Sequence, residues 1–301
     1  MTADLTTSFA VTIVDEFVRA GLTHAVISPG SRNTPLSLAL VRDGRVHVDV
    51  VLDERSAGFR ALGIAVATGR PVLVGCTSGS AAANLHPAVV EAFHARVPLH
   101  VCTADRPPEL QGVGAPQTID QTELFGAAVR AFFDAGPPGD DSSGWRPLAH
   151  DAYAAATGSP AGPVHVNLPF REPLLPTGEP LLDVPPIDPT VRPRIRTERD
   201  SLANELASAR GVLVAGWGSG VDAATVDAFA RRTGWPVLAD AISNLRTGPH
   251  AITMYESLLR ADDWADAHRP DLVVRIGAPL TSKVANAWLD RAPRTLSLIH
   301  I

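Results

Sequence analysis

Apolar residues recur first at helical and then at strand spacing along the start of the chain. Phe9, Ile13 and Phe17 are four residues apart, so they fall on one face of a helix, and Gly21 follows as a stop signal. The next run, HAVIS at residues 24–28, is short and almost wholly apolar, which indicates a buried strand. A helix followed by a buried strand is the beginning of an α/β pattern.

The same alternation continues to residue 104. The expected elements, in chain order, are a strand at 46–53, a helix at Glu54–Thr68 ended by Gly69, a strand at 71–77, one helix at 80–96 and a strand at 98–104. Because the strands are almost continuously apolar, we expect a parallel sheet with helices on both faces.

A proline-rich segment separates this region from a second α/β unit. Residues 173–194 contain seven prolines in 22 positions, which excludes a regular helix or strand and indicates an extended connector. Strand-like runs then follow at 211–220, 236–240 and 271–280, and the chain ends on another, RTLSLIHI. We expect a first domain at 1–175, a linker at 176–196 and a second, incomplete domain at 197–301.

Composition narrows the class of protein. The 45% hydrophobic and 19% charged residues suffice to fill and cover cores, and a net charge of −6 with scattered arginines provides no basic surface for nucleic acid. No run approaches the roughly 20 apolar residues of a membrane span, and the first residues lack a basic segment, so the cytoplasm is the expected location. Cys76 and Cys102 lie in separate apolar runs without a Cys-x-x-Cys pattern, so we expect buried thiols and no metal site.

Polar and glycine-rich sequences follow the predicted strands of the first domain. Ligands bind beyond the carboxyl ends of parallel strands, so these loops predict a site at one edge of the sheet. The loops are SPGSRNTP (28–35), DERSAG (53–58), TSGSAAAN (77–84) and ADRPPELQGVGAPQTIDQ (104–121).

Three of the four loops also have a purely structural interpretation. Asp53 is a favoured N-cap residue, and a glutamate at position 54 suits the first turn of a helix. Ser31 or Asn33 would cap the next helix, and Arg106 would form a salt bridge with Glu109.

Together with GPVHVNLPFREPL (162–174), the loops resemble a family of thiamine diphosphate enzymes, the 2-succinyl-5-enolpyruvyl-6-hydroxy-3-cyclohexene-1-carboxylate (SEPHCHC) synthases of menaquinone biosynthesis. The resemblance covers residues 9–175 in order and continues more loosely through GWGSG, PVLADAISNLRTG and GAPLTSK. SPGSR, ADRPPEL and QTIDQ separate this family from other thiamine diphosphate enzymes. The resemblance implies an α/β pyrimidine-binding domain with a parallel sheet, followed by an incomplete Rossmann-like central domain.

The resemblance also implies roles for individual residues. Glu54 would hydrogen-bond N1′ of the cofactor's aminopyrimidine and so promote loss of the proton from C2. The small residues Ala57, Gly58 and Ala61 would let the same helix approach a neighbour closely, and a partner subunit is the expected neighbour. Residues implied at the pyrimidine end of the cofactor are Pro29, Thr77 and Ser78, and those implied at the substrate are Ser31, Arg32, Arg106, Gln117 and Lys283.

The reaction implied is decarboxylation of 2-oxoglutarate and addition of the succinyl carbanion to isochorismate. Thiamine diphosphate and Mg²⁺ are the implied cofactors, with the metal and diphosphate ligands expected in a further domain, and a homodimer or dimer of dimers is the implied assembly. Two alternatives stay open: another 2-oxo acid carboligase resembling acetolactate synthase, and a non-catalytic remnant or partner subunit.

The second domain contains a weak imitation of a dinucleotide-binding fingerprint. Gly216 and Gly218 follow a strand, and Asp240 ends the next one, but Val221 occupies the third glycine position. A bound dinucleotide is therefore not expected.

Overall fold

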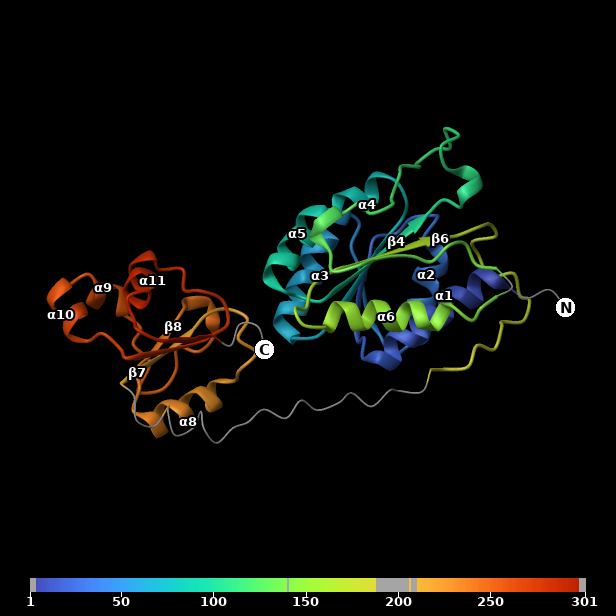
Figure 1. Cartoon of the computed structure of the whole chain (residues 1–301). Helices are drawn as coiled ribbons and strands as arrows, with labels where there is room; N and C mark the ends of the chain where they lie inside the picture. Colours follow the sequence, from blue (N-terminus) through green and yellow to red (C-terminus); the bar gives the residue numbers. More distant parts are fainter. Residues whose placement is uncertain (1–3, 140, 188–205, 207–209, 298–301) are drawn as a thin grey trace. The chain divides into compact units, whose positions relative to one another are not determined.

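The computed structural model of the chain describes residues 4–139, 141–187, 206 and 210–297 (Figure 1). It divides into two compact units, Met1–Thr190 and Val191–Ile301. Each unit is a parallel sheet with helices on both faces, which confirms the predicted α/β fold class.

The first unit contains a six-stranded sheet in the order β2-β1-β3-β4-β6-β5, and every neighbouring pair is parallel. Its strands are β1 (His24–Ile27), β2 (His47–Val50), β3 (Val72–Cys76), β4 (Leu99–Asp105), β5 (Phe132–Asp134) and β6 (Val164–Pro169). β3, β4 and β6 are buried along their whole length, as their apolar sequences predict.

One strand departs from the expected burial. β2 lies at the edge of the sheet, so Val50 is 60% exposed and Leu52, just beyond the strand, is 81% exposed. The apolar run at 46–53 is therefore a short edge strand rather than a buried one.

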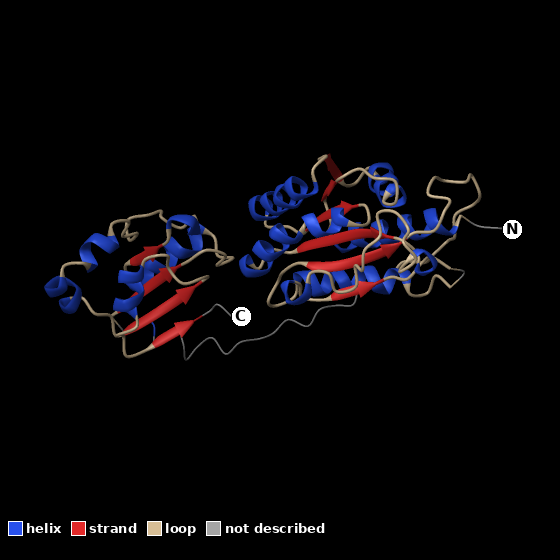
Figure 2. Ribbon diagram, turned by 90° about the horizontal axis from the view of Figure 1, so that it is seen from above, coloured by secondary structure: helices blue, strands red, loops and turns tan. Residues whose placement is uncertain are grey.

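Helices cover both faces of this sheet (Figures 1 and 2). The first core contains α1, α2 and α6, and Phe9, Ile13 and Phe17 of α1 point into it as their spacing predicts. The opposite face is covered by α3 and α5, with α4 between them in the chain. The helices are α1 (Leu5–Ala20), α2 (Thr34–Asp43), α3 (Glu54–Thr68), α4 (Ser80–Asn84), α5 (His86–Ala95) and α6 (Trp145–Thr157), with short 3₁₀ turns at Pro108–Leu110 and Gly126–Ala128.

α3 has the predicted ends. The Asp53 carboxylate accepts a hydrogen bond from the Ser56 amide at 2.8 Å, and Gly69 ends the helix in the left-handed region with φ of 65°. The small residues on its inner face pack within the same unit, because a Cβ on Gly58 would lie 2.9 Å from the Cβ of Ala88 in α5. The small residues thus allow the expected close approach, but the neighbour is α5 of the same unit and not a partner subunit.

The single helix expected at 80–96 is two helices. The Leu85 amide donates to the carbonyl of Ala82 in a tight turn, and α5 begins at His86. Pro87, in the first turn of α5, has no amide hydrogen with which to continue the hydrogen-bond ladder of α4.

The described part of the proline-rich connector, up to residue 187, is an extended segment tied to the first unit. The amides of Thr177 and Leu182 donate to Asp4 Oδ2 and Ser8 Oγ, both at 2.9 Å, and Arg146 Nε donates to the carbonyl of Val184 at 2.9 Å. The rest of the connector lies outside the described residues.

The second unit is a four-stranded parallel sheet in the order β10-β9-β7-β8. Alternate residues of β7 point to opposite faces, Val212 and Val214 into one core and Leu213 and Ala215 into the other. Its strands are β7 (Gly211–Ala215), β8 (Val237–Ala239), β9 (Leu272–Ile276) and β10 (Thr295–Ser297), and its helices are α8 (Ala223–Thr233), the 3₁₀ turn Ala241–Ser243, α9 (Tyr255–Leu259), α10 (Asp262–Ala267) and α11 (Lys283–Leu289).

The last residues of the expected strand RTLSLIHI, 298–301, lie outside the described residues. Among the residues that the structure describes, no helix is long and apolar enough to cross a membrane.

Candidate functional site

Three of the predicted loops meet at the carboxyl edge of the first sheet. Gly30 lies against Thr77, where a Cβ on the glycine would be 2.4 Å from the threonine Cβ, so only glycine permits this approach. Ser78 Oγ donates to the carbonyl of Gln117 at 2.9 Å, and Gln117 Nε2 donates to the carbonyl of Ser78 at 3.1 Å. The loops after β1, β3 and β4 therefore form one continuous surface.

Arg32 is a buried cation at this edge. Its residue is 4% exposed, Nη1 donates to the carbonyl of Phe170 at 2.9 Å, and Nη2 lies 3.6 Å from the exposed Glu172 carboxylate. Nε has no partner within the described part of the chain. Burial lowers the pKa of the Arg32 guanidinium, and the positive charge of Arg106 lowers it further. An anion bound between the two guanidiniums would compensate both effects.

Arg106 does not pair with Glu109, so that structural alternative is wrong. Its Nε and Nη2 donate to the carbonyl of Pro116 at 3.4 and 3.1 Å. Glu109 is instead held by Arg171 through two hydrogen bonds of 2.6 and 2.9 Å. The Arg106 guanidinium is thus fixed by a neutral carbonyl and keeps its net charge.

The capping alternative for the first loop is also wrong. Asn33 precedes α2, but its side chain makes no capping bond and Nδ2 donates to the carbonyl of Ser28 at 2.9 Å. Ser31 is exposed, and its one hydrogen bond within the described part of the chain is through its backbone carbonyl, which accepts from the Thr34 amide at 3.2 Å. Pro29 is exposed beside it.

Asp53 and Glu54 have separate roles in the structure. The Asp53 carboxylate is used in capping α3, whereas the Glu54 carboxylate accepts no hydrogen bond from the described residues. The Cys76 thiol is fully buried, which raises its pKa, and the nearby negative charge of Glu54 raises it further. Glu54 is therefore a half-buried carboxylate near Cys76, the last residue of β3, and is free to bind a ligand.

A buried hydrogen-bond network supports these loops from below. Gln121 Oε1 accepts from the Gly79 amide, and Gln121 Nε2 donates to Asn167 Oδ1, both at 2.9 Å. Asn167 Nδ2 donates to Asp105 Oδ2 at 2.9 Å, and Asp105 Oδ1 accepts from the Arg106 amide at 2.7 Å. The network links the turn at Gly79 to the backbone of Arg106.

Asp105, Gln121 and Asn167 are positioning residues that the sequence patterns did not predict. The available signal was an asparagine inside the mainly apolar strand VHVNLP. A buried amide in a central strand needs polar partners, and here the partners carry the ligand-binding loops.

Asn167→Asp is expected to destabilise the first unit by about 2–4 kcal/mol at pH 7.5. The substitution replaces the donor facing Asp105 by a second carboxylate, and burial already raises the pKa of Asp105. The loss is expected to shrink at pH 5, because one proton shared by the two carboxyl groups removes the repulsion.

Urea unfolding at both pH values measures this effect. Asn84→Asp, at the exposed end of α4, is the matched control and should change little. Equal stability of the Asn167 variant and the wild type would contradict the role of the network.

Lys283 belongs to the second unit, where it is exposed at the first residue of α11. The residues that the structure gathers at the carboxyl edge of the first sheet all come from the first unit. Among the described residues, no cluster of three or more His, Cys, Asp or Glu side chains is arranged to hold a metal ion.

Gly216 and Asp240, two of the residues that imitate a dinucleotide fingerprint, are in close contact with the loop after β9. A Cβ on Gly216 would lie 1.6 Å from the carbonyl oxygen of Ala278, so the loop after β9 fills this space. Asp240 is 2% exposed and accepts hydrogen bonds from the amide and the hydroxyl of Thr281, at 2.6 and 3.3 Å. This pattern serves packing, as the missing third glycine indicates.

Two family models match the chain, one in each unit. Residues 7–124 match the thiamine pyrophosphate enzyme N-terminal TPP-binding domain, and residues 190–295 match the middle domain of the same enzymes. The chain belongs to the thiamine pyrophosphate enzyme family. Thiamine pyrophosphate is thiamine diphosphate, so the expected cofactor class agrees with the family.

The most similar relatives of this thiamine pyrophosphate enzyme chain include three proteins named 2-succinyl-5-enolpyruvyl-6-hydroxy-3-cyclohexene-1-carboxylate synthase. The protein of Thermobifida fusca is 47% identical over 297 residues, that of Geobacillus kaustophilus 43% over 318 and that of Myxococcus xanthus 41% over 313. Each alignment covers 96% of this chain and 53% of the relative. The chain therefore spans about half the length of the curated relatives that it matches, and the resemblance seen in its motifs is confirmed.

Proposed function

We propose that this chain provides the pyrimidine-binding and isochorismate-binding surface of a SEPHCHC synthase. The proposed reaction decarboxylates 2-oxoglutarate and adds its succinyl unit to isochorismate. The observation that carries the proposal is the pair of like-charged guanidiniums, Arg32 and Arg106, at the sheet edge where Glu54, a carboxylate without a hydrogen-bond partner among the described residues, lies near the end of β3. The 47% identity to a protein of that name supports the choice of substrates.

The residues present fit the pyrimidine end of thiamine diphosphate. When bound, the cofactor supplies the carbon centre that holds the substrate carbons after CO₂ leaves. Glu54 would share a proton with N1′ of the aminopyrimidine, which requires a carboxylate without an internal partner. Pro29, Thr77 and Ser78 would line the ring, because the close approach of Gly30 to Thr77 brings their loops together.

Isochorismate carries two carboxylates, which explains a site with two guanidiniums. Arg32 offers a buried donor, Nε, that has no partner in the described residues, and Arg106 is held in place by a single carbonyl. Ser31 and Gln117 would add hydroxyl and amide groups at the exposed rim. Lys283 is proposed as a further substrate contact on the strength of the sequence resemblance alone.

Magnesium and a second copy of the chain complete the proposal. Mg²⁺ would bind through the cofactor's diphosphate. Dimerisation would bury exposed apolar side chains on β2, just beyond it, and on α3 and α5, because removal of apolar surface from water favours association. The side chains are Val50, Leu52, Phe59, Val66 and Val90.

The proposed substrate site is tested by Arg32→Gln and Arg106→Gln in the full product of the gene. Each substitution is expected to raise the KM for isochorismate about ten- to a hundredfold, because a charge-assisted hydrogen bond is lost, while decarboxylation of 2-oxoglutarate changes less. Arg171→Gln is the control, since that guanidinium pairs with Glu109 on the exposed surface.

Steady-state assays of both half-reactions, with analysis of the product, measure the effect. Equal losses in the two half-reactions would place Arg32 and Arg106 in support of the cofactor or the fold. A product formed without isochorismate would favour a different 2-oxo acid carboligase.

A further inference from the structure

A cavity of about 360 Å³ lies in the second unit, at the amino edge of the sheet, where its strands begin. Its lining includes Arg210 and Gly211 at the start of β7, Pro236 just before β8 and Pro270 just before β9. In a parallel sheet these positions share the amino edge, so the cavity lies at the edge opposite to the one where β7, β8 and β9 end.

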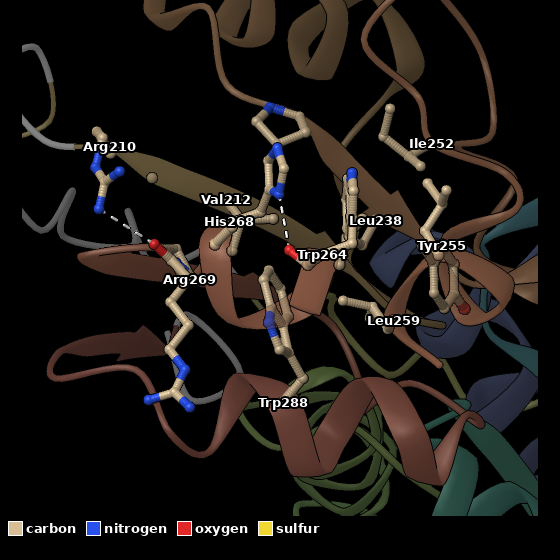
Figure 3. Close-up of a pocket in the computed structure, with 15 residues that line it drawn as sticks. Arg210, Val212, Leu238, Ile252, Tyr255, Leu259, Trp264, His268, Arg269 and Trp288 are labelled. Atoms are coloured by element: carbon tan, nitrogen blue, oxygen red, sulfur yellow. Dashed lines mark hydrogen bonds between the residues drawn. The ribbon is translucent and has the colours of Figure 1, made fainter. Parts of the chain in front are cut away.

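The walls of the cavity are mainly apolar and include several aromatic rings (Figure 3). Val212 and Leu238 form the floor on the sheet, and the aromatic residues Tyr255, Trp264 and Trp288 come from α9, α10 and α11. The side chains vary in accessibility: Tyr255 is 4% exposed and Trp288 8%, whereas Trp264 at the rim is 38% exposed.

Polar groups around the cavity already have partners. His268 stacks on Trp264 with ring centroids 4.1 Å apart, and its Nδ1 lies 2.7 Å from the Trp264 carbonyl. Trp288 Nε1 donates to the carbonyl of Ala265 at 2.8 Å, which turns this polar atom to the helix backbone.

The two arginines at the rim are neutralised by carboxylates. Arg210 pairs with Asp271 at 3.2 Å, and Arg269 pairs with Asp266 at 2.6 Å. A charged ligand in the cavity would therefore lose its hydration without finding an unpaired arginine to compensate for that loss.

We propose that this cavity binds an uncharged, flat aromatic molecule of one or two fused rings. The volume lies at the lower end of the range of small-molecule sites, and the rings on three helices offer faces and edges against which another ring stacks. This site is independent of the function proposed for the first unit, since its residues all belong to the second.

Calorimetric titration of the 301-residue chain with 2-naphthol tests the proposal. We expect a dissociation constant on the order of 10⁻⁴ M, which corresponds to burial of roughly 200 Å² of apolar ligand surface. Two matched probes separate the features of the ligand: 2-naphthoate has the same rings with a negative charge, and decahydro-2-naphthol has a similar size without flat rings. Both are expected to bind at least about fivefold more weakly.

Ala267→Trp should locate the site. Ala267 is an exposed residue of α10 that lines the cavity, so a tryptophan there would occupy the opening without entering the core. Binding of 2-naphthol should weaken at least about tenfold, because the substituted ring takes the ligand's space. Ala224→Trp, at an exposed position of α8, is the control and should bind as the wild type does.

Three results would overturn the proposal. The first is absence of 2-naphthol binding to folded protein, and the second is equal binding by the Ala267 and Ala224 variants. The third is a dimer, detected by light scattering, that Ala267→Trp alone dissociates, because the cavity would then be part of a protein interface.

Discussion

Glu54→Gln is expected to slow proton exchange at C2 of bound thiamine diphosphate by about 10²–10⁴-fold, the usual contribution of a general acid–base group. Glutamine keeps the size of the side chain and the fold of α3, but it cannot take up or release the shared proton. The Glu54 carboxylate accepts no hydrogen bond from the described residues, so its removal leaves no buried group unsatisfied. The loss should therefore be chemical rather than structural.

Deuterium exchange followed by acid quench and proton NMR measures this rate in the full product of the gene. Asp53→Asn is the matched control, because asparagine caps helices about as well as aspartate and the capping bond to Ser56 is retained. Exchange should be normal in the Asp53 variant. If the Glu54 variant exchanges at the wild-type rate while the cofactor is bound, Glu54 is only a residue of the first helical turn.

The first unit is expected to lose about 4–5 kcal/mol of stability between pH 6.5 and 4.5 through two buried histidines. His100 is fully buried between Phe17 and Tyr153, and burial lowers its pKa to about 3. His165 is also buried, and its pKa falls to about 4.

The direction of this pH dependence follows from proton binding in the folded and unfolded states. Below the ordinary histidine pKa of 6.5, the unfolded chain takes up protons at both positions while the folded chain does not. Acid therefore favours the unfolded state, by about 1.4 kcal/mol per pH unit for each histidine until the folded pKa is reached. The stability that comes from keeping both histidines neutral is therefore fully present above pH 6.5.

His100→Phe should reduce this acid sensitivity by about half without a loss of stability at pH 7.5. Neither ring nitrogen of His100 has a partner among the described residues, and phenylalanine keeps the stacking with Tyr153. Hydrogen exchange of peptides from β4 and β6, followed by mass spectrometry at several pH values, measures the stability of this unit. His94→Phe, at an exposed position of α5, is the control, and equal pH dependence of the two variants would contradict the assignment.

Local sequence signals predicted several elements to the residue. The helix Glu54–Thr68 is bounded by Asp53, whose carboxylate bonds the amide three residues on, and by Gly69, which takes a left-handed conformation. Interactions of this range involve only neighbouring residues, so they are readable without knowledge of the fold. The position of the candidate site was readable for a similar reason, because parallel strands place all their carboxyl ends at one edge.

The same local reasoning was wrong where distant residues compete for a partner. Arg106 and Glu109 are close in sequence, yet Arg171, 62 residues from Glu109, binds that carboxylate through two parallel hydrogen bonds. A planar guanidinium that meets a carboxylate in this geometry outcompetes a neighbour that must bend back on a tight turn. The exposure of β2 was missed because strand order, which makes it an edge strand, is set by contacts between residues far apart.

By itself, the sequence determined the α/β class, the family of the chain and the identity of the four loops that carry polar groups at one sheet edge. Only the tertiary structure decided which of these groups are free to bind a ligand. The buried Arg32 donates a hydrogen bond from Nη1 to the carbonyl of Phe170, 138 residues away in the chain. The Gly79 amide donates to the side chain of Gln121, which in turn donates to the side chain of Asn167. Periodicity and motifs report local geometry and chemistry, whereas the availability of a charge or an amide depends on long-range packing that satisfies some polar groups and leaves others unpaired.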